Sequence, residues 1–144
     1  MFPPTLVDLR ALLERLWRPG VLPERPRETR PPTLAVRRTR TRRPFCPGLY
    51  IRSRHRIELE LGPGTGAADV VATLLHEATH AAGPMAHDRS FRLLFREVAR
   101  AATGVWLPDV DVAQPSFDDA LVERLEGLAG APALLYGPDG ARLI

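Results

Sequence analysis

The chain has 144 residues, a formal net charge of +3 at pH 7 and a single cysteine. This length suits one domain with its own hydrophobic core, and one cysteine excludes an internal disulfide. No apolar run approaches the roughly 20 residues that span a bilayer, and the first residues lack the regions of a signal peptide. We therefore expect a single cytoplasmic domain over residues 1–144 with no membrane partner.

Charge is divided unevenly along the chain. Residues 1–56 carry fourteen arginines and four acidic residues, whereas residues 57–144 carry six arginines and thirteen acidic residues. A basic half beside an acidic half is typical of proteins that bind nucleic acid. Every Lys or Arg position is arginine, however, and the many Pro, Ala and Leu residues also fit a GC-rich coding bias with solvated arginines. The charge pattern leaves both interpretations open.

The first part of the chain predicts one helix followed by short strands. Leucines recur at helical spacing over residues 5–17, which indicates an amphipathic N-terminal helix. The proline-rich segment 21–32 reads as an extended connector. Alternating apolar and polar residues predict three strands, over residues 33–43, 49–51 and 57–61.

The second part predicts helices. Residues 67–82 contain no proline or glycine, carry apolar residues at helical spacing and stop at Gly83-Pro84. Asp88 is placed to cap a helix over 89–103, which Gly104 ends. A C-terminal helix and hairpin are expected over residues 116–144, the helix over 116–128 and the hairpin over 133–144.

These elements predict the α+β class. We expect a core over residues 33–107, in which a short twisted sheet packs on the helix at 67–82 and on a second core helix.

The helix at 67–82 carries the pattern H-E-x-x-H, formed by His76, Glu77 and His80. Residues four apart in a helix share one face, so the two imidazoles can hold one Zn²⁺ while Glu77 acts as general base on bound water. The pattern also arises by chance on exposed polar helix faces. Here the helix also faces the core, and three of the four histidines in the chain lie within twelve positions, which favours a metal site.

A catalytic zinc site takes three protein ligands and keeps one position for water. We predict His87 as the third ligand, because the chain can double back after the Gly-Pro turn. Glu97, on the following helix, is the alternative ligand. A metzincin would need a histidine at position 86, which is Ala86, and a methionine after Met85, where the chain has none. The metzincin class is therefore excluded.

Several other side chains carry weaker signals. His55 is interpreted as a surface or loop histidine outside the site, and Cys46 as a half-buried small apolar residue without a catalytic role. Tyr50, Tyr136 or an arginine could stabilise an oxyanion, and the sequence does not choose among them.

Together these segments resemble the SprT-like zinc metalloproteases, the group that includes the Spartan proteases. The likeness covers roughly residues 33–103. Its parts are a basic strand with Arg37 to Arg43, Cys-Pro-Gly at 46–48, a strand at 56–61, the motif at 73–81, and His87 to Phe91, which is similar to the family's His-Gly-x-x-Phe. Asp88 stands where the family usually has glycine, and no Cys-x-x-Cys pairs follow, so the zinc ribbon of some members is absent. The C-terminal helix and hairpin are unmatched and could cover the cleft.

The resemblance implies a zincin-type fold and hydrolysis of peptide bonds in a protein or peptide substrate. It implies Zn²⁺ held by His76, His80 and His87, with Glu77 as the base. Members of the family often act on DNA-bound proteins, which would make DNA the partner of five arginines: Arg37, Arg38, Arg40, Arg42 and Arg43. The alternative function is a basic nucleic-acid-binding protein on a zincin scaffold with little or no protease activity. A purely structural metal site is disfavoured, because structural zinc usually has four protein ligands.

Overall fold

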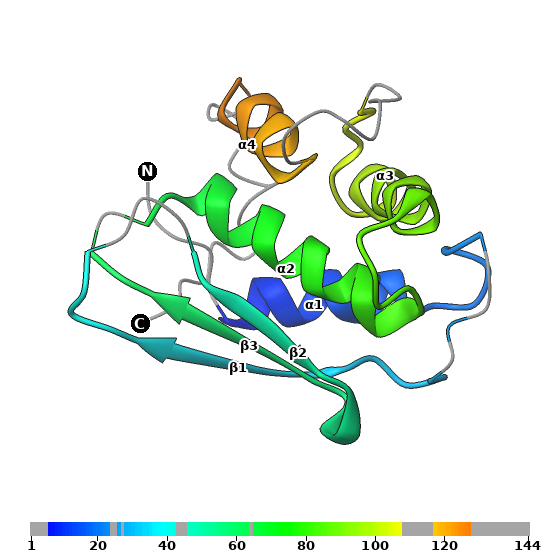
Figure 1. Cartoon of the computed structure of the whole chain (residues 1–144), viewed down its shortest axis with the longest axis horizontal. Coiled ribbons are helices and arrows are strands. Elements are labelled where there is room, and N and C mark those ends of the chain that lie inside the picture. Colours follow the sequence, from blue (N-terminus) through cyan, green and yellow to red (C-terminus); the bar gives the residue numbers. More distant parts are fainter. Residues whose placement is uncertain are drawn as a thin grey trace.

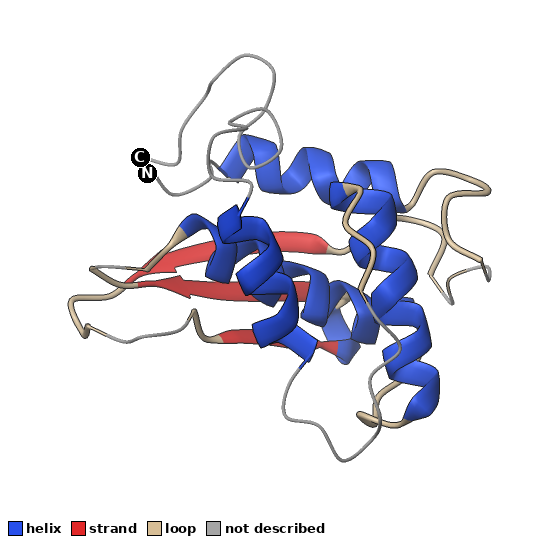
Figure 2. Ribbon diagram, turned by 90° about the horizontal axis from the view of Figure 1, so that it is seen from above, coloured by secondary structure: helices blue, strands red, loops and turns tan. Residues whose placement is uncertain are grey.

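The computed structural model describes residues 6–23, 26, 28–42, 46–63, 65–107 and 117–127. Within these ranges the chain is α+β, as predicted, with four α-helices and a three-stranded sheet. The elements in order are α1 (Leu6–Leu16), β1 (Thr33–Arg38), β2 (Gly48–Ile51), the 3-10 helix η1 (Arg52–Arg54), β3 (Arg56–Leu61), α2 (Ala67–Ala82), α3 (Arg89–Thr103) and α4 (Phe117–Gly127). The α-helices lie on one side of the sheet (Figure 1), and the view from above shows part of this helical layer over the strands and part beside them (Figure 2).

The sheet is mixed, with β3 in the centre. Its order is β1-β3-β2; β1 pairs with β3 in parallel, and β2 pairs with β3 antiparallel. The strict alternation of β3 puts Ile57, Leu59 and Leu61 in the core. On the opposite face Glu60 of β3 lies 4.0 Å from Arg37 of the neighbouring β1. The sheet therefore presents one apolar face to the helices and one polar face away from them.

Helix α2 is the centre of the molecule. It packs on β2 and β3 on one side and on α3 and α4 on the other. Its predicted bounds are confirmed, and most of its residues are buried, including Leu74 and Leu75 with no exposed surface. A helix surrounded in this way is a rigid element on which to mount a reactive side chain.

Helix α3 follows the predicted caps. The Asp88 side chain accepts a hydrogen bond of 3.0 Å from the Phe91 backbone N–H, and Gly104 ends the helix in the left-handed conformation at φ 75°. Its stripe, with Phe91, Phe95 and Val98, is buried. These caps fix the position of the loop between α2 and α3.

The predicted first strand was too long. β1 ends at Arg38, because its partner β3 ends at Leu61, the last residue in register with it. Arg40 and Arg42 follow β1 outside the strand. Residues 43–45, the end of the C-terminal helix at 128 and the hairpin at 133–144 lie outside the described residues.

Candidate metal centre

The two histidines of the motif and His87 come together. His76 and His80 lie one turn apart on α2, with ring centroids 5.1 Å apart. His87 reaches them from the loop that follows: its Nε2 lies 3.0 Å from Nε2 of His76 and 2.9 Å from Nε2 of His80. These three residues form the histidine cluster, in which the ligand atoms all lie within 4.8 Å of one another. They are close enough to bind a metal ion.

The loop that carries His87 is short and held at both ends. Helix α2 stops at Gly83, whose N–H bonds back to the His80 carbonyl at 3.2 Å, and α3 begins at the Asp88 cap. Four residues lie between these two points, so the chain doubles back and presents His87 to α2, as the sequence predicted. His87 itself is exposed, whereas His80 is buried.

The donor set fits a divalent cation. A neutral imidazole carries a single N–H, so His87 Nε2 cannot donate to His76 and to His80 at once. The His80 Nδ1–H donates to the Pro84 carbonyl at 2.8 Å, which leaves the lone pair of His80 on Nε2, the atom in the cluster. Three nitrogens around a tetrahedral zinc ion stand roughly 3.3 Å apart, a few tenths of an ångström more than the separations here. A cation accepts all three lone pairs together.

One wall of the histidine cluster is aromatic. The Phe91 ring lies 4.9 Å, 4.6 Å and 5.0 Å from the rings of His76, His80 and His87, measured between centroids. Phe91 is buried and fixed in the first turn of α3. A rigid apolar neighbour restricts the orientations of the imidazoles and excludes water from that side.

Glu77 is held apart from the histidine cluster. It is buried, and its Oε1 accepts a hydrogen bond of 3.1 Å from the backbone N–H of Tyr50 in β2. It does not belong to the group of metal-ligating atoms among the described residues. Its carboxylate is therefore placed beside His76 but oriented by the sheet, a contact that nothing in the sequence pattern indicated.

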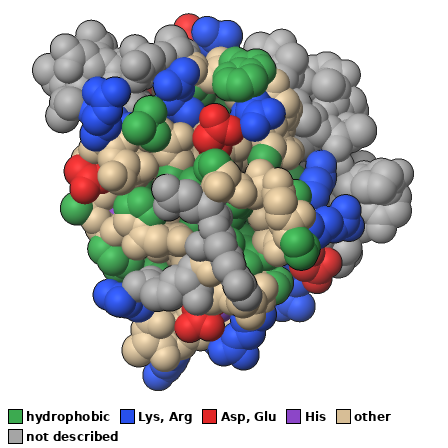
Figure 3. All heavy atoms as spheres, turned by 90° about the vertical axis from the view of Figure 1, so that its right-hand side faces the viewer, with side chains coloured by type: hydrophobic (Ala, Val, Ile, Leu, Met, Phe, Trp, Pro, Cys, Tyr) green, Lys and Arg blue, Asp and Glu red, His purple; other side chains and the backbone are tan. Residues whose placement is uncertain are grey.

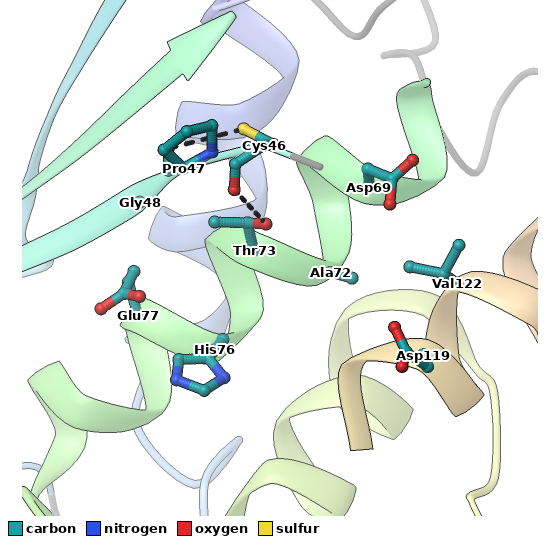
Figure 4. Close-up of a pocket in the computed structure, with 10 residues that line it drawn as sticks. All are labelled: Cys46, Pro47, Gly48, Asp69, Ala72, Thr73, His76, Glu77, Asp119 and Val122. Atoms are coloured by element: carbon teal, nitrogen blue, oxygen red, sulfur yellow. Dashed lines mark hydrogen bonds between the residues drawn. The ribbon is translucent and has the colours of Figure 1, made fainter. Parts of the chain in front are cut away.

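A cavity of about 460 Å³ lies beside Glu77 and His76. Figure 4 shows the start of β2 on one side of α2 and helix α4 on the other. The residues that line the cavity are Cys46, Pro47, Gly48, Asp69, Ala72, Thr73, His76, Glu77, Asp119 and Val122. The C-terminal helix thus forms one wall of the cavity. The sequence suggested that it could cover the cleft, but not which residues face it.

Two carboxylates lie at the α4 side of this cavity, on Asp69 and Asp119. Burial raises the pKa of Asp69, and the charges of Glu126 and Asp119 raise it further. This end of the cavity is therefore acidic.

Cys46 is more deeply buried than predicted. Only 3% of it is exposed, and its Sγ donates to the Glu60 carbonyl at 3.4 Å. Burial, the largest effect, raises the pKa of the Cys46 thiol to about 12. The thiol stays protonated near neutral pH and is unsuited to nucleophilic or metal-binding roles.

We expect native Cys46 to resist alkylation. A pKa of about 12 instead of 9.0 lowers the thiolate fraction roughly a thousandfold, and burial blocks access as well. The rate of iodoacetamide labelling at pH 8, followed by mass spectrometry, tests this. Protein unfolded in urea is the control and should label fully, whereas rapid labelling of the folded protein would show that the thiol is accessible.

His55 lies in the turn between η1 and β3, which agrees with the predicted loop histidine, but it is buried rather than at the surface. Its Nε2–H donates to the Arg30 carbonyl and its Nδ1 accepts from the Tyr50 hydroxyl, both at 2.8 Å. It lies outside the histidine cluster, as expected. Because the Tyr50 hydroxyl is bonded to His55, Tyr50 is a poor candidate for the oxyanion donor, and Tyr136 lies outside the described residues.

Glu97, the alternative ligand, also lies outside the cluster. Its carboxylate pairs with Arg100 at 2.8 Å, and it lines a different cavity, between α3 and the end of α2. Among the residues that the structure describes, the third position beside His76 and His80 is taken by His87.

The basic run stands apart from the cavity beside His76 and Glu77. Arg37, Arg38, Arg40 and Arg42 are exposed, and Arg43 is outside the described residues. The run begins on β1, which β3 separates from the β2 wall of the cavity. It starts at the arrowhead end of β1 in Figure 1 and continues beyond it, and the face in Figure 3 shows basic side chains spread around its rim.

Two further findings bear on the class of protein. None of the described helices is long and apolar enough to cross a membrane. Comparisons with protein-family models, with curated proteins and with solved structures found no match to this chain.

Proposed function

We propose that the protein is a zinc-dependent peptidase with a zincin-type fold, similar to the SprT-like metalloproteases. One observation carries the proposal: three imidazole Nε2 atoms converge from α2 and the loop after it, and Glu77, the residue after His76 on α2, is oriented by β2. Three nitrogen ligands with a neighbouring carboxylate are the composition of a catalytic zinc site.

Zinc is the metal that this donor set favours. The cluster offers imidazole nitrogens alone, without thiolate or carboxylate among the described residues. Imidazole suits Zn²⁺, whereas Mg²⁺ and Ca²⁺ prefer oxygen ligands. Three protein ligands leave one position for a reacting group, which separates this arrangement from a structural site with four.

The chemistry divides between the ion and Glu77. When bound, zinc lowers the pKa of water at its open position towards about 7 and polarises a carbonyl. Glu77 would accept a proton from the water as its oxygen bonds to the carbonyl carbon, and would deliver that proton to the amide nitrogen as the carbon–nitrogen bond breaks, so the carboxylate would be regenerated at the end of the cycle. The hydrogen bond from Tyr50 keeps the Glu77 side chain in one orientation throughout.

The edge of β2 supports a peptide as the substrate. The Glu60 N–H donates to the Pro47 carbonyl at 2.9 Å, so Pro47 bonds towards β3. Because bonding alternates along an antiparallel pair, the backbone groups of Gly48 point the other way, to the edge of β2 that faces the cavity, where the next N–H, that of Tyr50, is bonded to Glu77. An extended peptide can add to such an edge as a further strand. The scissile bond would then lie close to Glu77.

Cleavage of an unfolded protein such as casein tests the proposal. We expect cleavage that stops on addition of a zinc chelator and returns when Zn²⁺ is restored. Protein treated with chelator and then with Mg²⁺ is the control, and it should stay inactive. Zinc-loaded protein that leaves casein and a mixed peptide library intact would contradict the proposal.

Binding to DNA is a second candidate function. The observation that favours it is the exposure of four arginines within six positions, Arg37, Arg38, Arg40 and Arg42. Glu60 lies at the 4.0 Å limit of an ion pair with Arg37, and this weak contact neutralises little of the Arg37 charge.

We expect Arg40→Ala to weaken DNA binding and to reduce its salt dependence. Each lost phosphate contact lowers the slope of log K against log salt by about one. Fluorescence anisotropy with a labelled duplex at several salt concentrations measures this slope. Arg89→Ala, an exposed arginine on α3, is the matched control. Equal slopes for both variants would remove the basic run as the DNA contact.

A further inference from the structure

The segment before β2 is fastened to two neighbouring elements. The Thr73 hydroxyl of α2 donates to the Cys46 carbonyl at 2.9 Å, and Figure 4 shows this bond across the cavity wall. On the other side, the Glu60 N–H of β3 donates to the Pro47 carbonyl at 2.9 Å. The segment is therefore fixed between the helix that carries the candidate site and the central strand.

Gly48 allows a close approach between β2 and α2. A Cβ at this position would overlap the Thr73 Cγ2 methyl, and it would also lie 3.2 Å from Leu59 Cδ2 and 3.3 Å from Glu77 Cγ. The Thr73 side chain cannot turn this methyl away without giving up the hydrogen bond of its hydroxyl to Cys46. A larger residue at position 48 would therefore break that bond or push β2 away from α2 and Glu77.

This approach brings a backbone donor to the carboxylate. Tyr50 lies two residues after Gly48, so the two residues point their backbone groups to the same side of the strand. The Tyr50 N–H donates to Glu77 Oε1 at 3.1 Å in a buried environment. The length of that hydrogen bond depends on how near β2 lies to α2, which Gly48 and Thr73 determine together.

We infer that Gly48 and Thr73 are positioning residues for the general base Glu77. In this role neither residue reacts with the substrate; both act through Glu77. The missing side chain at Gly48 and the hydroxyl of Thr73 hold β2 at the distance where the Tyr50 N–H fixes one carboxylate oxygen. A base held in this way needs no reorganisation before it takes the proton. The inference rests on the proposed peptidase function, and it adds the second layer of residues that this function needs.

Four variants test the inference: Gly48→Ala, Thr73→Ser, the double variant Gly48→Ala/Thr73→Ser, and Thr73→Val. Gly48→Ala should lower kcat about 10- to 100-fold, since a displacement of about 1 Å costs up to that much. Thr73→Ser removes the methyl that the new Cβ would meet and keeps the hydroxyl. As a single variant it should have a kcat close to that of the wild type, and in the double variant it should restore the kcat that Gly48→Ala loses. Zinc content, measured for every variant, should not change.

The Tyr50 amide provides a readout that does not depend on activity. In ¹H–¹⁵N spectra a hydrogen bond to a carboxylate moves this amide proton downfield. We expect an upfield shift in Gly48→Ala and recovery in the double variant. Thr73→Val loses the hydroxyl but keeps the methyl volume, so it should show a partial upfield shift and a lower kcat. This variant decides the question if Gly48→Ala does not fold.

The outcomes separate the inference from the function on which it rests. If the wild type is active, and both Gly48→Ala and Thr73→Val keep its kcat and its Tyr50 amide resonance, the positioning role is overturned. A kcat loss that Thr73→Ser fails to restore would overturn it too. A wild-type protein without peptidase activity would overturn the proposed function. The positioning role would then be overturned too, because it rests on that function. The Tyr50 amide resonance would still report separately whether Gly48 sets the contact between β2 and Glu77.

Discussion

Glu77→Gln is expected to bind zinc as the wild type does and to lose peptidase activity by about 10²- to 10⁴-fold, the range typical of a general base. Glutamine has the same shape, and its Oε1 can still accept the Tyr50 N–H, so the local structure should be kept. It cannot accept the proton from water. Measurement of kcat with a fluorogenic peptide, beside zinc content by mass spectrometry, tests both parts.

Glu97→Gln is the matched control for this change. Glu97 lies on α3 outside the histidine cluster, and its partner is Arg100. The variant should keep both zinc and activity. If Glu77→Gln retained proteolysis, the base would have to be another group, and the roles assigned to α2 would need revision.

His87→Ala is expected to have the second large effect, on metal affinity. Removal of a residue that only hydrogen-bonds to a metal ligand costs about 10- to 100-fold in metal affinity. His87 is proposed to be a ligand itself, so its removal should lower zinc affinity by more than that. Zinc affinity can be measured by competition with a chromophoric chelator. The expected cause is the removal of the Nε2 that lies 3.0 Å and 2.9 Å from those of His76 and His80.

Met85→Ala serves as the control for the same loop. Met85 is exposed and offers no nitrogen or oxygen ligand from its side chain. It should bind zinc as tightly as the wild type. Equal affinities for His87→Ala and wild type would show that the third ligand lies elsewhere, in a group beyond the cluster.

The parts of the site that are close in sequence could be predicted from it. The bounds of α2 follow from a stretch without proline or glycine between two glycines, and those of α3 follow from Asp88 and Gly104. The convergence of His87 with α2 follows from the few residues between the two helices. In each case the physical cause is local: helix periodicity, capping and chain length.

The parts that depend on distant segments could not be predicted. The parallel pairing of β1 with β3, the hydrogen bond from Tyr50 to Glu77 and the α4 wall of the cavity join residues far apart in the chain. The burial of His55 could not be predicted for the same reason, because it depends on the Arg30 carbonyl and the Tyr50 hydroxyl. Periodicity identifies which face of an element is apolar, but not which element covers it.

X-ray absorption at the zinc edge of the zinc-loaded protein tests the central claim most directly. Three imidazole nitrogens at about 2.0–2.1 Å and one oxygen ligand are predicted, with one zinc ion bound per chain. A first shell containing sulfur, fewer than three imidazoles, or no zinc uptake at all would contradict the assignment of His76, His80 and His87.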